Sequence, residues 1–168
     1  MLKIAYGAAG LAALATAATG AATGAANAQL LTHKDISLAM AVTMARTAIE
    51  TCKGQGYNVS VNVLGRNGEV ILGLRNELAG PATFENSMKK AFTARTFRIP
   101  SGKFAENVKG NPTAGALFLT NIVPAQGALP IVVDGDTIGS IGVSGAPGGD
   151  KDEACAKAGI DKVAAELK

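Results

Sequence analysis

The sequence has no tryptophan and few other aromatic residues. Two tyrosines and five phenylalanines are spread over 168 residues, so aromatics make up 4% of the chain. This scarcity argues against the stacking platforms on which nucleobases and sugars bind. The formal net charge is +3 and the basic residues form no stripe, so nothing predicts a nucleic-acid partner.

Histidine and the usual glycine motifs are also scarce. His33 is the single histidine, so a Ser/His/Asp triad would depend entirely on it. Gly139, Gly142 and Gly145 do not have the G-x-G-x-x-G spacing of a dinucleotide site, and no phosphate-loop lysine is present. Without an obvious general base, the sequence favours a binding protein over an enzyme, and catalysis would have to come from a bound cofactor.

Residues 1–28 have the pattern of a secretory signal peptide. Lys3 gives a small positive start, an uncharged alanine-rich stretch follows, and Ala26-Asn27-Ala28 is a cleavage motif. A membrane anchor is the alternative, but glycines and threonines make the stretch less apolar than a membrane span. Cleavage would leave 15 basic and 13 acidic residues, a net charge of +2, in residues 29–168. We expect this mature chain to be periplasmic or secreted, with no stable insertion in a membrane.

The two cysteines, Cys52 and Cys155, fall in two predicted helices. In an oxidising compartment a disulfide between them is the simplest interpretation. Two buried free thiols are the alternative. A metal site is not indicated, because neither cysteine has a second cysteine or a histidine close by in the sequence.

The first half of the chain predicts a helix and a hairpin. Thr32 and Asp35 offer a capping start, and an apolar position recurs every four residues up to Gly54. Residues 57–64 then alternate apolar and polar side chains, which is the period of a half-buried strand. After the Asn67-Gly68 turn, residues 69–75 form a second strand.

The second half predicts helices followed by another hairpin. Residues 84–97 read as a helix with a basic outer face that ends before Pro100, and residues 101–108 as a further short helical stretch. The apolar residues 114–123 are interpreted as a short helix and one more strand. Residues 131–133 and 137–144 flank Asp134-Gly135, a dipeptide that tolerates the positive φ angles of a tight hairpin. Asp150 and Glu153 have the spacing of a capping box for a last helix.

This order predicts one α/β (α+β) domain over residues 29–168. Short turns suit an antiparallel sheet, here of about five strands, with the first and last helices on one face. That layout would also bring Cys52 and Cys155 together.

Candidate ligand-binding residues are cationic. The densest positive group comprises Arg75, Lys89, Lys90, Arg95 and Arg98. If the second helix packs over the end of the sheet, Arg75 and Lys90 converge on an anion such as a small carboxylate or a haem propionate. A solvated basic face is the alternative. His33 is interpreted either as an exposed residue near the mature N-terminus or as an axial ligand of haem iron or another metal.

Four segments, in this order, resemble the GlcG/HbpS family of haem-binding and haem-degrading proteins. They are Asn67-Gly68, Lys90-Ala91-Phe92-Thr93-Ala94, the string GSIGVSG from Gly139 to Gly145, and Asp152-Glu153 with Ala158-Gly159-Ile160. The resemblance implies an α-β-α domain of profilin-like type, homo-oligomeric assembly and, in some members, binding or slow degradation of haem. Other members are linked to glycolate or bind small organic acids.

The resemblance also implies site residues. Arg75 stands where the family has an arginine after its second strand, and Lys90 and Thr93 stand in its K-A-x-T-A segment. The chain departs at Asn76-Glu77-Leu78, where Met-Asp-Gly is common, and at Gln126-Gly127, where two glycines are common. Both departures lie on the expected ligand side.

Three functions follow as hypotheses. The first is an exported protein that binds haem, or a related anionic cofactor, through Arg75, Lys90 and Thr93, with His33 as a possible iron ligand. The second is a binding protein or accessory enzyme for a small hydroxy or keto acid, similar to glycolate. The third is an oligomeric assembly module without a ligand. Pocket size distinguishes the first two, since haem needs a large apolar surface and a two-carbon acid does not.

Overall fold

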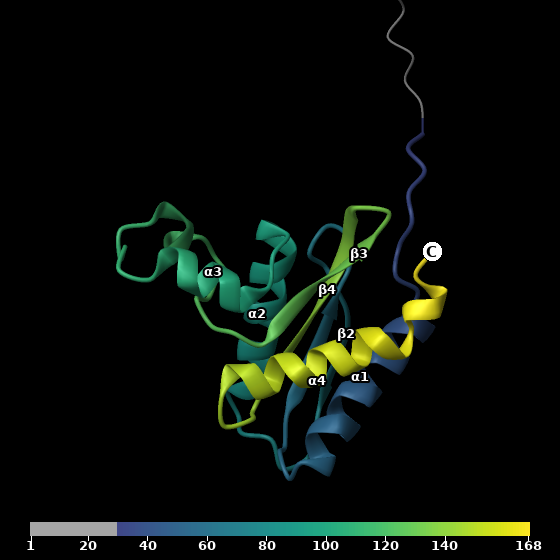
Figure 1. Ribbon diagram of the computed structural model, residues 1–168, viewed down its shortest axis with the longest axis horizontal. Coiled ribbons are helices and arrows are strands. Elements are labelled where there is room, and N and C mark those ends of the chain that lie inside the picture. The colour runs from purple at the N-terminus through teal and green to yellow at the C-terminus, as the bar shows by residue number, and fades with distance from the viewer. Residues whose placement is uncertain (1–29) are drawn as a thin grey trace, which may run out of the picture. The chain divides into compact units, whose positions relative to one another are not determined.

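Four strands form one antiparallel sheet in the order β2-β1-β4-β3. The structure is a computed structural model that describes residues 30–168, so the predicted signal peptide lies outside the described residues (Figure 1). The elements in chain order are α1 (Leu38–Gly54), β1 (Ser60–Leu64), β2 (Val70–Arg75), α2 (Thr83–Phe97), α3 (Ser101–Val108), a 3-10 helix (Gly115–Phe118), β3 (Ala128–Val133), β4 (Asp136–Ser144), α4 (Gly149–Lys162) and a 3-10 helix (Ala164–Glu166). The predicted α+β class is confirmed.

Both predicted hairpins are present, and they join in the middle of the sheet. Asp134 and Gly135 connect β3 to β4 with φ angles of 51° and 79°, the left-handed conformation that a tight hairpin turn requires. Gly68, at φ 81°, serves the β1–β2 turn. The two hairpins meet where β1 pairs with β4, from Ser60 opposite Ser144 to Leu64 opposite Ser140.

The sheet has four strands where about five were predicted. Residues 114–123 form no strand among the described residues. Their backbone groups bond locally instead, for example from the Leu117 N–H to the Ala114 carbonyl and from the Leu119 N–H to the Ala116 carbonyl. Asn121 has a φ of 67°, which also breaks an extended run. An apolar composition without a period of two was therefore insufficient to form a strand.

Two helix starts also differ from the prediction. Ser37 caps α1 by accepting a hydrogen bond of 3.2 Å from the Met40 N–H, so neither Thr32 nor Asp35 is the cap. In α4 the capping residue is Gly148, and no side chain caps the helix. The predicted capping box of Asp150 and Glu153 is therefore wrong.

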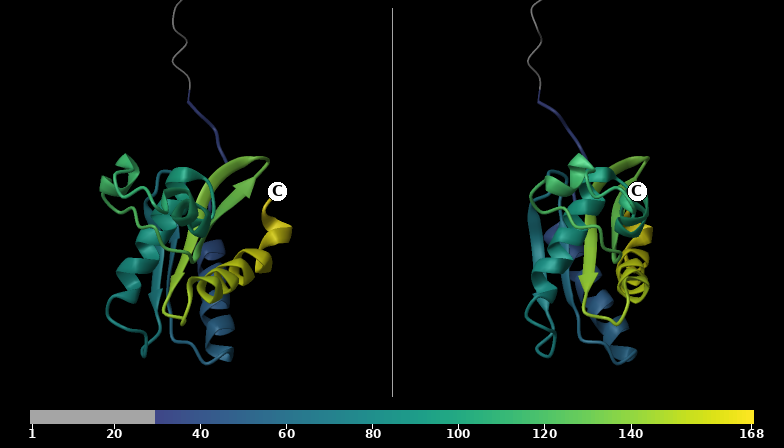
Figure 2. Two further views of the ribbon diagram at one scale, coloured as in Figure 1. Left: turned by 60° about the vertical axis from the view of Figure 1, so that its left-hand side comes forward. Right: turned by 90° about the vertical axis from the view of Figure 1, so that its left-hand side faces the viewer.

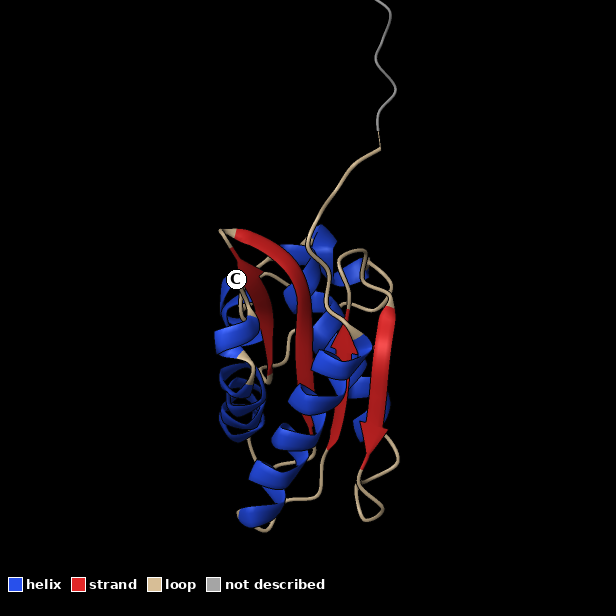
Figure 3. Cartoon of the chain, turned by 90° about the vertical axis from the view of Figure 1, so that its right-hand side faces the viewer, coloured by secondary structure: helices blue, strands red, loops and turns tan. Residues whose placement is uncertain are grey.

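One face of the sheet is apolar and packs against α1 and α4. Val61, Val63, Ile141 and Val143 are fully buried there together with side chains from both helices. The two helices lie side by side in Figure 1, and Figure 3 shows α1 crossing in front of the strands. The disulfide between Cys52 and Cys155 joins them, with 5.7 Å between the Cα atoms. The predicted pairing of the two cysteines is confirmed.

The opposite face is built from small and polar residues and packs against α2. The sheet lies between α2 on one side and α1 with α4 on the other (Figure 2). Asn62 donates hydrogen bonds to the Phe84 carbonyl (3.0 Å) and to Ser87 Oγ (2.8 Å). Ser140 donates to the Ala91 carbonyl at 2.8 Å. The strand that was predicted to be half-buried is buried throughout, because α2 covers its polar side.

Gly142 allows α2 to lie directly on the sheet. A Cβ atom at this position would meet the backbone carbonyl of Ser87 and would lie 2.8 Å from the Ala91 amide nitrogen. Both are backbone atoms, so the helix itself would have to move. The close approach of helix and sheet therefore requires glycine here.

We expect Gly142→Ala to lower the free energy of unfolding by about 1–3 kcal/mol through overpacking. Urea denaturation followed by circular dichroism measures this change. Gly54→Ala is the matched control, because nothing lies within 4 Å of a Cβ at that helical position. It should leave stability within about 0.5 kcal/mol of wild type or raise it slightly. Equal stability of wild type and Gly142→Ala would contradict the close packing.

Replacement of both cysteines, Cys52→Ala with Cys155→Ala, should lower the free energy of unfolding by about 3–5 kcal/mol. The disulfide spans 103 residues of sequence, and a cross-link that closes so long a loop restricts the unfolded chain strongly. Urea denaturation of the oxidised wild type, the reduced wild type and the double variant measures the effect. The reduced wild type should resemble the variant; no difference among the three would show that the cross-link contributes nothing to stability.

Candidate functional site

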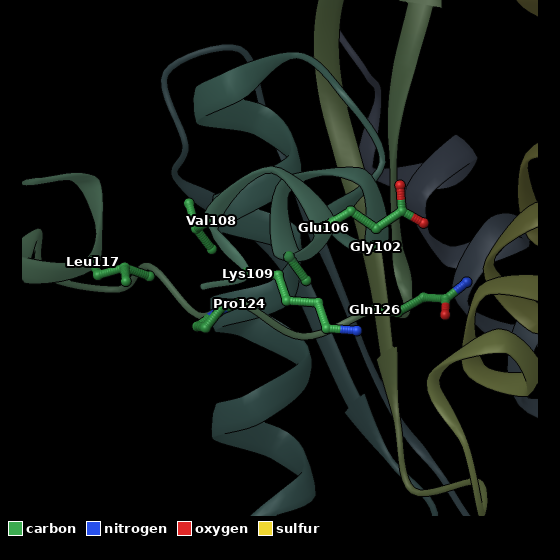
Figure 4. Close-up of a pocket in the computed structure, with 8 residues that line it drawn as sticks. Gly102, Glu106, Val108, Lys109, Leu117, Pro124 and Gln126 are labelled. Carbon is green, nitrogen blue, oxygen red and sulfur yellow. The ribbon is translucent and has the colours of Figure 1, made fainter. Parts of the chain in front are cut away.

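A cavity of about 470 Å³ lies between α3 and the segment that leads into β3. Figure 4 shows the side chains around it, with Lys109 extending toward Gln126. It is lined by Gly102, Ala105, Glu106, Val108, Lys109, Leu117, Pro124 and Gln126. We call it the α3 pocket.

Short-range packing fixes the inner wall of the α3 pocket. Ser101, the first residue of α3, accepts a hydrogen bond of 2.9 Å from the Ala128 amide at the start of β3. Phe104 stacks on Phe97 at the end of α2, with 4.4 Å between the ring centroids. Gly102 lies against Gln126, since a Cβ on the glycine would be 2.8 Å from Gln126 Cγ. These contacts hold α3 against both its neighbours.

The chemistry of the α3 pocket is apolar with charge at its edge. Ala105, Val108, Leu117 and Pro124 supply carbon surface. Glu106 forms a 3.1 Å ion pair with Lys103, whereas no carboxylate among residues 30–168 lies within ion-pairing distance of Lys109. The pocket therefore suits a molecule with a broad apolar surface and a carboxylate.

Exposed apolar side chains adjoin the α3 pocket in the sequence. Phe118 and Leu119 follow Leu117 and are 76% and 55% exposed. Neighbouring exposed side chains of this size are typical of a binding surface. Sequence reasoning missed the pocket, although the apolar run 114–123 after a short amphipathic helix was its visible signal.

Lys90 and Asp152 form an ion pair inside the molecule. Lys90 Nζ lies 2.7 Å from the Asp152 carboxylate, and each side chain is 4% exposed. The ammonium group also donates to the Val143 carbonyl (3.2 Å), and the carboxylate accepts from the Ala146 amide (2.9 Å). Burial raises the pKa of Asp152, while the hydrogen bond and charge of Lys90 act in the opposite direction. Lys90 is therefore not part of the solvated basic face that was one interpretation of α2, because its side chain is buried in this ion pair.

Gly127 makes room for the ion pair. A Cβ atom there would lie 2.7 Å from Lys90 Nζ and 2.8 Å from the Val143 carbonyl oxygen. Its φ of 133° is also one that other residues rarely adopt. In the Gln126-Gly127 pair, which stands where two glycines are common in the family, Gln126 departs from the pattern and Gly127 keeps it. The space that the ion pair needs explains why Gly127 is a glycine.

Thr93 and Arg75 are held by backbone groups of the domain. The Thr93 hydroxyl donates to the Lys89 carbonyl at 2.8 Å and accepts from the Val123 amide at 3.0 Å. The Arg75 guanidinium donates through Nε to the Ala79 carbonyl at 3.1 Å. Arg75 lines a separate cavity of about 320 Å³ beside α1.

His33 lies in the segment before α1. Its Nε2 atom is 3.0 Å from the Asp35 carboxylate. Neither His33 nor any other of the four predicted ligand residues lines the α3 pocket. Arg75 lines the cavity beside α1, Lys90 and Thr93 are bonded inside the domain, and His33 contacts Asp35 before α1. The described residues therefore do not bring these four side chains together in one site.

Residues 30–168 hold neither a metal-ligand cluster nor a helix suited to a membrane. Within them, no three His, Cys, Asp or Glu side chains gather in a group that could hold a metal ion. None of the helices in this part of the chain has the length and apolarity needed to cross a membrane.

A family model described as haem-degrading HbpS-like protein matches residues 36–161. This chain belongs to the HbpS-like family. Protein GlcG of Escherichia coli is 32% identical over 111 residues, which cover 65% of this chain and 81% of GlcG. The crystal structure of HbpS is 35% identical with a TM-score of 0.75, and the match covers 83% of this chain and 95% of HbpS. A PduOC–haem complex, at 23% identity and a TM-score of 0.69, shares the fold over 76% of this chain and 94% of its own.

We expect Lys90→Met to lower the free energy of unfolding by about 3–5 kcal/mol, because it leaves the Asp152 carboxylate buried without its partner. Combining it with Asp152→Asn should recover part of that loss. Lys89→Met is the matched control, since Lys89 pairs with Glu85 at the surface and should contribute less than about 1 kcal/mol. Chemical denaturation compares the four proteins. Equal stability of Lys90→Met and Lys89→Met would remove the structural role of the ion pair.

Proposed function

We propose that this chain is an exported protein that binds haem in the α3 pocket. The observation that carries the proposal is the cavity of about 470 Å³, with an apolar wall and Lys109 at its edge. A cavity of this volume falls within the usual range for organic ligands. The family description, haem-degrading HbpS-like protein, supports the choice of ligand.

The residues of the α3 pocket fit part of a haem. Ala105, Val108, Leu117 and Pro124 suit the porphyrin face, and Lys109 suits a propionate. The lining contains no His, Cys, Met or Tyr, the side chains that usually ligate haem iron. Bound haem would supply a redox-active iron. The pocket residues would hold the haem through its porphyrin face and a propionate, and not through the iron. We therefore propose binding without assigning an iron ligand from the pocket.

The rest of the proposal concerns location and assembly. Export to the periplasm or to the outside of the cell rests on the signal-peptide pattern of residues 1–28. Assembly with further copies of the chain rests on the family resemblance. Export is compatible with the disulfide between Cys52 and Cys155, because an oxidising compartment preserves disulfides.

A haem titration followed by absorbance tests the proposal. Ala105→Trp places an indole in the α3 pocket and should raise the Kd for haem about tenfold or more. Ala39→Trp is the matched control, because Ala39 is an exposed residue of α1, and it should bind as wild type does. Lys109→Gln should weaken binding only about two- to fivefold, as an exposed charge pair does.

Two outcomes would change the proposal. If Ala105→Trp and Ala39→Trp bind haem equally, the α3 pocket is not the site. If the wild type shows no saturable change in absorbance, the small hydroxy or keto acid becomes the leading ligand. His33→Ala should bind haem normally, since His33 does not line the pocket; loss of binding in this variant would identify His33 as the iron ligand.

A further inference from the structure

A third, smaller cavity is lined by three arginines. Arg66 comes from the β1–β2 turn, and Arg95 and Arg98 come from the last turn of α2 and its C-cap. The cavity has a volume of about 150 Å³. Asn67 and Thr96 add polar side chains to the lining. We call it the arginine pocket.

Arg66 is neutralised and held in place by its neighbours. Its guanidinium pairs with Asp136, lies 3.3 Å from Asp35 and donates to the Lys34 carbonyl at 2.7 Å. The side chain is 17% exposed. Two carboxylates therefore more than balance this arginine, and they fix one wall of the arginine pocket.

Arg95 and Arg98 form no such ion pair among the described residues. Among residues 30–168 no carboxylate lies within 4 Å of either guanidinium. Arg95 Nε is buried and has no hydrogen-bond partner in the described part of the chain. A buried donor without a partner costs free energy, and for a charged group the cost is higher. The Arg95 side chain also lines the arginine pocket together with Arg66 and Arg98, so an anion bound there would offset the charge of its guanidinium group.

The positive charges around Arg95 also favour a bound anion. Burial lowers the pKa of Arg95, and the positive charges of Arg98 and Arg66 lower it further. Asp136 and Glu69 act in the opposite sense without reversing the direction. The C-terminal end of α2 adds about half a negative charge, which is less than the charge of one guanidinium group.

We propose that the arginine pocket binds a small oxyanion of the phosphate type. A tetrahedral oxyanion presents acceptor oxygens in several directions, so it can contact Arg95 and Arg98 at once, whereas a monocarboxylate presents two oxygens in one plane. Guanidinium groups bind phosphate oxygens through paired hydrogen bonds, and Arg95 and Arg98 both line the arginine pocket. The small volume of the arginine pocket suits a small anion better than a porphyrin.

Calorimetric titration of the full mature protein with inorganic phosphate tests this site. Arg95→Gln and Arg98→Gln should each raise the Kd for phosphate about tenfold or more. Arg46→Gln is the matched control, because Arg46 lines a different cavity, and it should bind as wild type does. Acetate should bind the wild type about tenfold more weakly than phosphate, and glycerol phosphate tests whether a phosphoryl group on a larger molecule is also accepted.

A second measurement does not depend on the variants folding. In a ¹H–¹⁵N spectrum of the wild type, the Nε–H resonance of Arg95 should shift saturably with phosphate. Absence of saturable binding by the wild type, or equal affinity of wild type and a folded Arg95→Gln, would overturn the proposal. Arg95→Gln should bind haem with the same Kd as wild type. The phosphate proposal and the haem proposal are therefore tested independently.

Discussion

The contact between α2 and the sheet is the constraint on which the rest of the structure depends. Helices usually pack on sheets through large apolar side chains, but here the facing residues are Ser, Asn and Gly. Asn62 and Ser140 bond directly to groups of α2, and Gly142 admits the helix backbone. Hydrogen bonds specify both distance and register, whereas apolar contacts are less directional. The last turn of α2 and the start of α3 are therefore placed accurately, and both candidate pockets lie beside them.

The two faces of the sheet are stabilised by different kinds of interaction. On the side of α1 and α4, apolar burial dominates and the disulfide adds a covalent link between the helices. On the side of α2, polar contacts replace most of the apolar ones. Lys90 connects these two layers, since it extends from α2 to the Val143 carbonyl of β4 and to Asp152 of α4. A buried ion pair at such a junction favours one relative arrangement of the layers, because any other would leave a charge unpaired.

Local signals in the sequence predicted local structure well. Asp134-Gly135 predicted a hairpin because few other residues adopt two successive positive φ angles. The helix periodicity placed Cys52 on a buried face, and the chain order then paired it with Cys155. Residues 114–123 were predicted to form a short helix and then a strand. A short 3-10 helix is present at Gly115–Phe118, but the strand is not, because composition alone does not reveal a pairing partner.

The site was harder to predict, because burial is a property of the whole fold. The alternation of residues 57–64 predicted that Ser60 and Asn62 face solvent, but α2 covers them and both are buried. Lys90 looked like a ligand for an anion, but its partner is Asp152, 62 residues further along the chain. No local pattern announces such a partner. The α3 pocket likewise depends on how residues 109–126 turn back toward α3, which no repeat or motif in that segment specifies.

The position of the disulfide gives the domain an unusual topology. Cys52 and Cys155 enclose both hairpins, α2, α3 and both candidate pockets within a covalent ring. A protease that cuts the chain once inside this ring, for instance in the exposed segment around Phe118, opens the ring without releasing a fragment. The two pieces of the nicked molecule stay covalently joined until the disulfide is reduced. A domain with this topology survives a single backbone cut as one covalent particle.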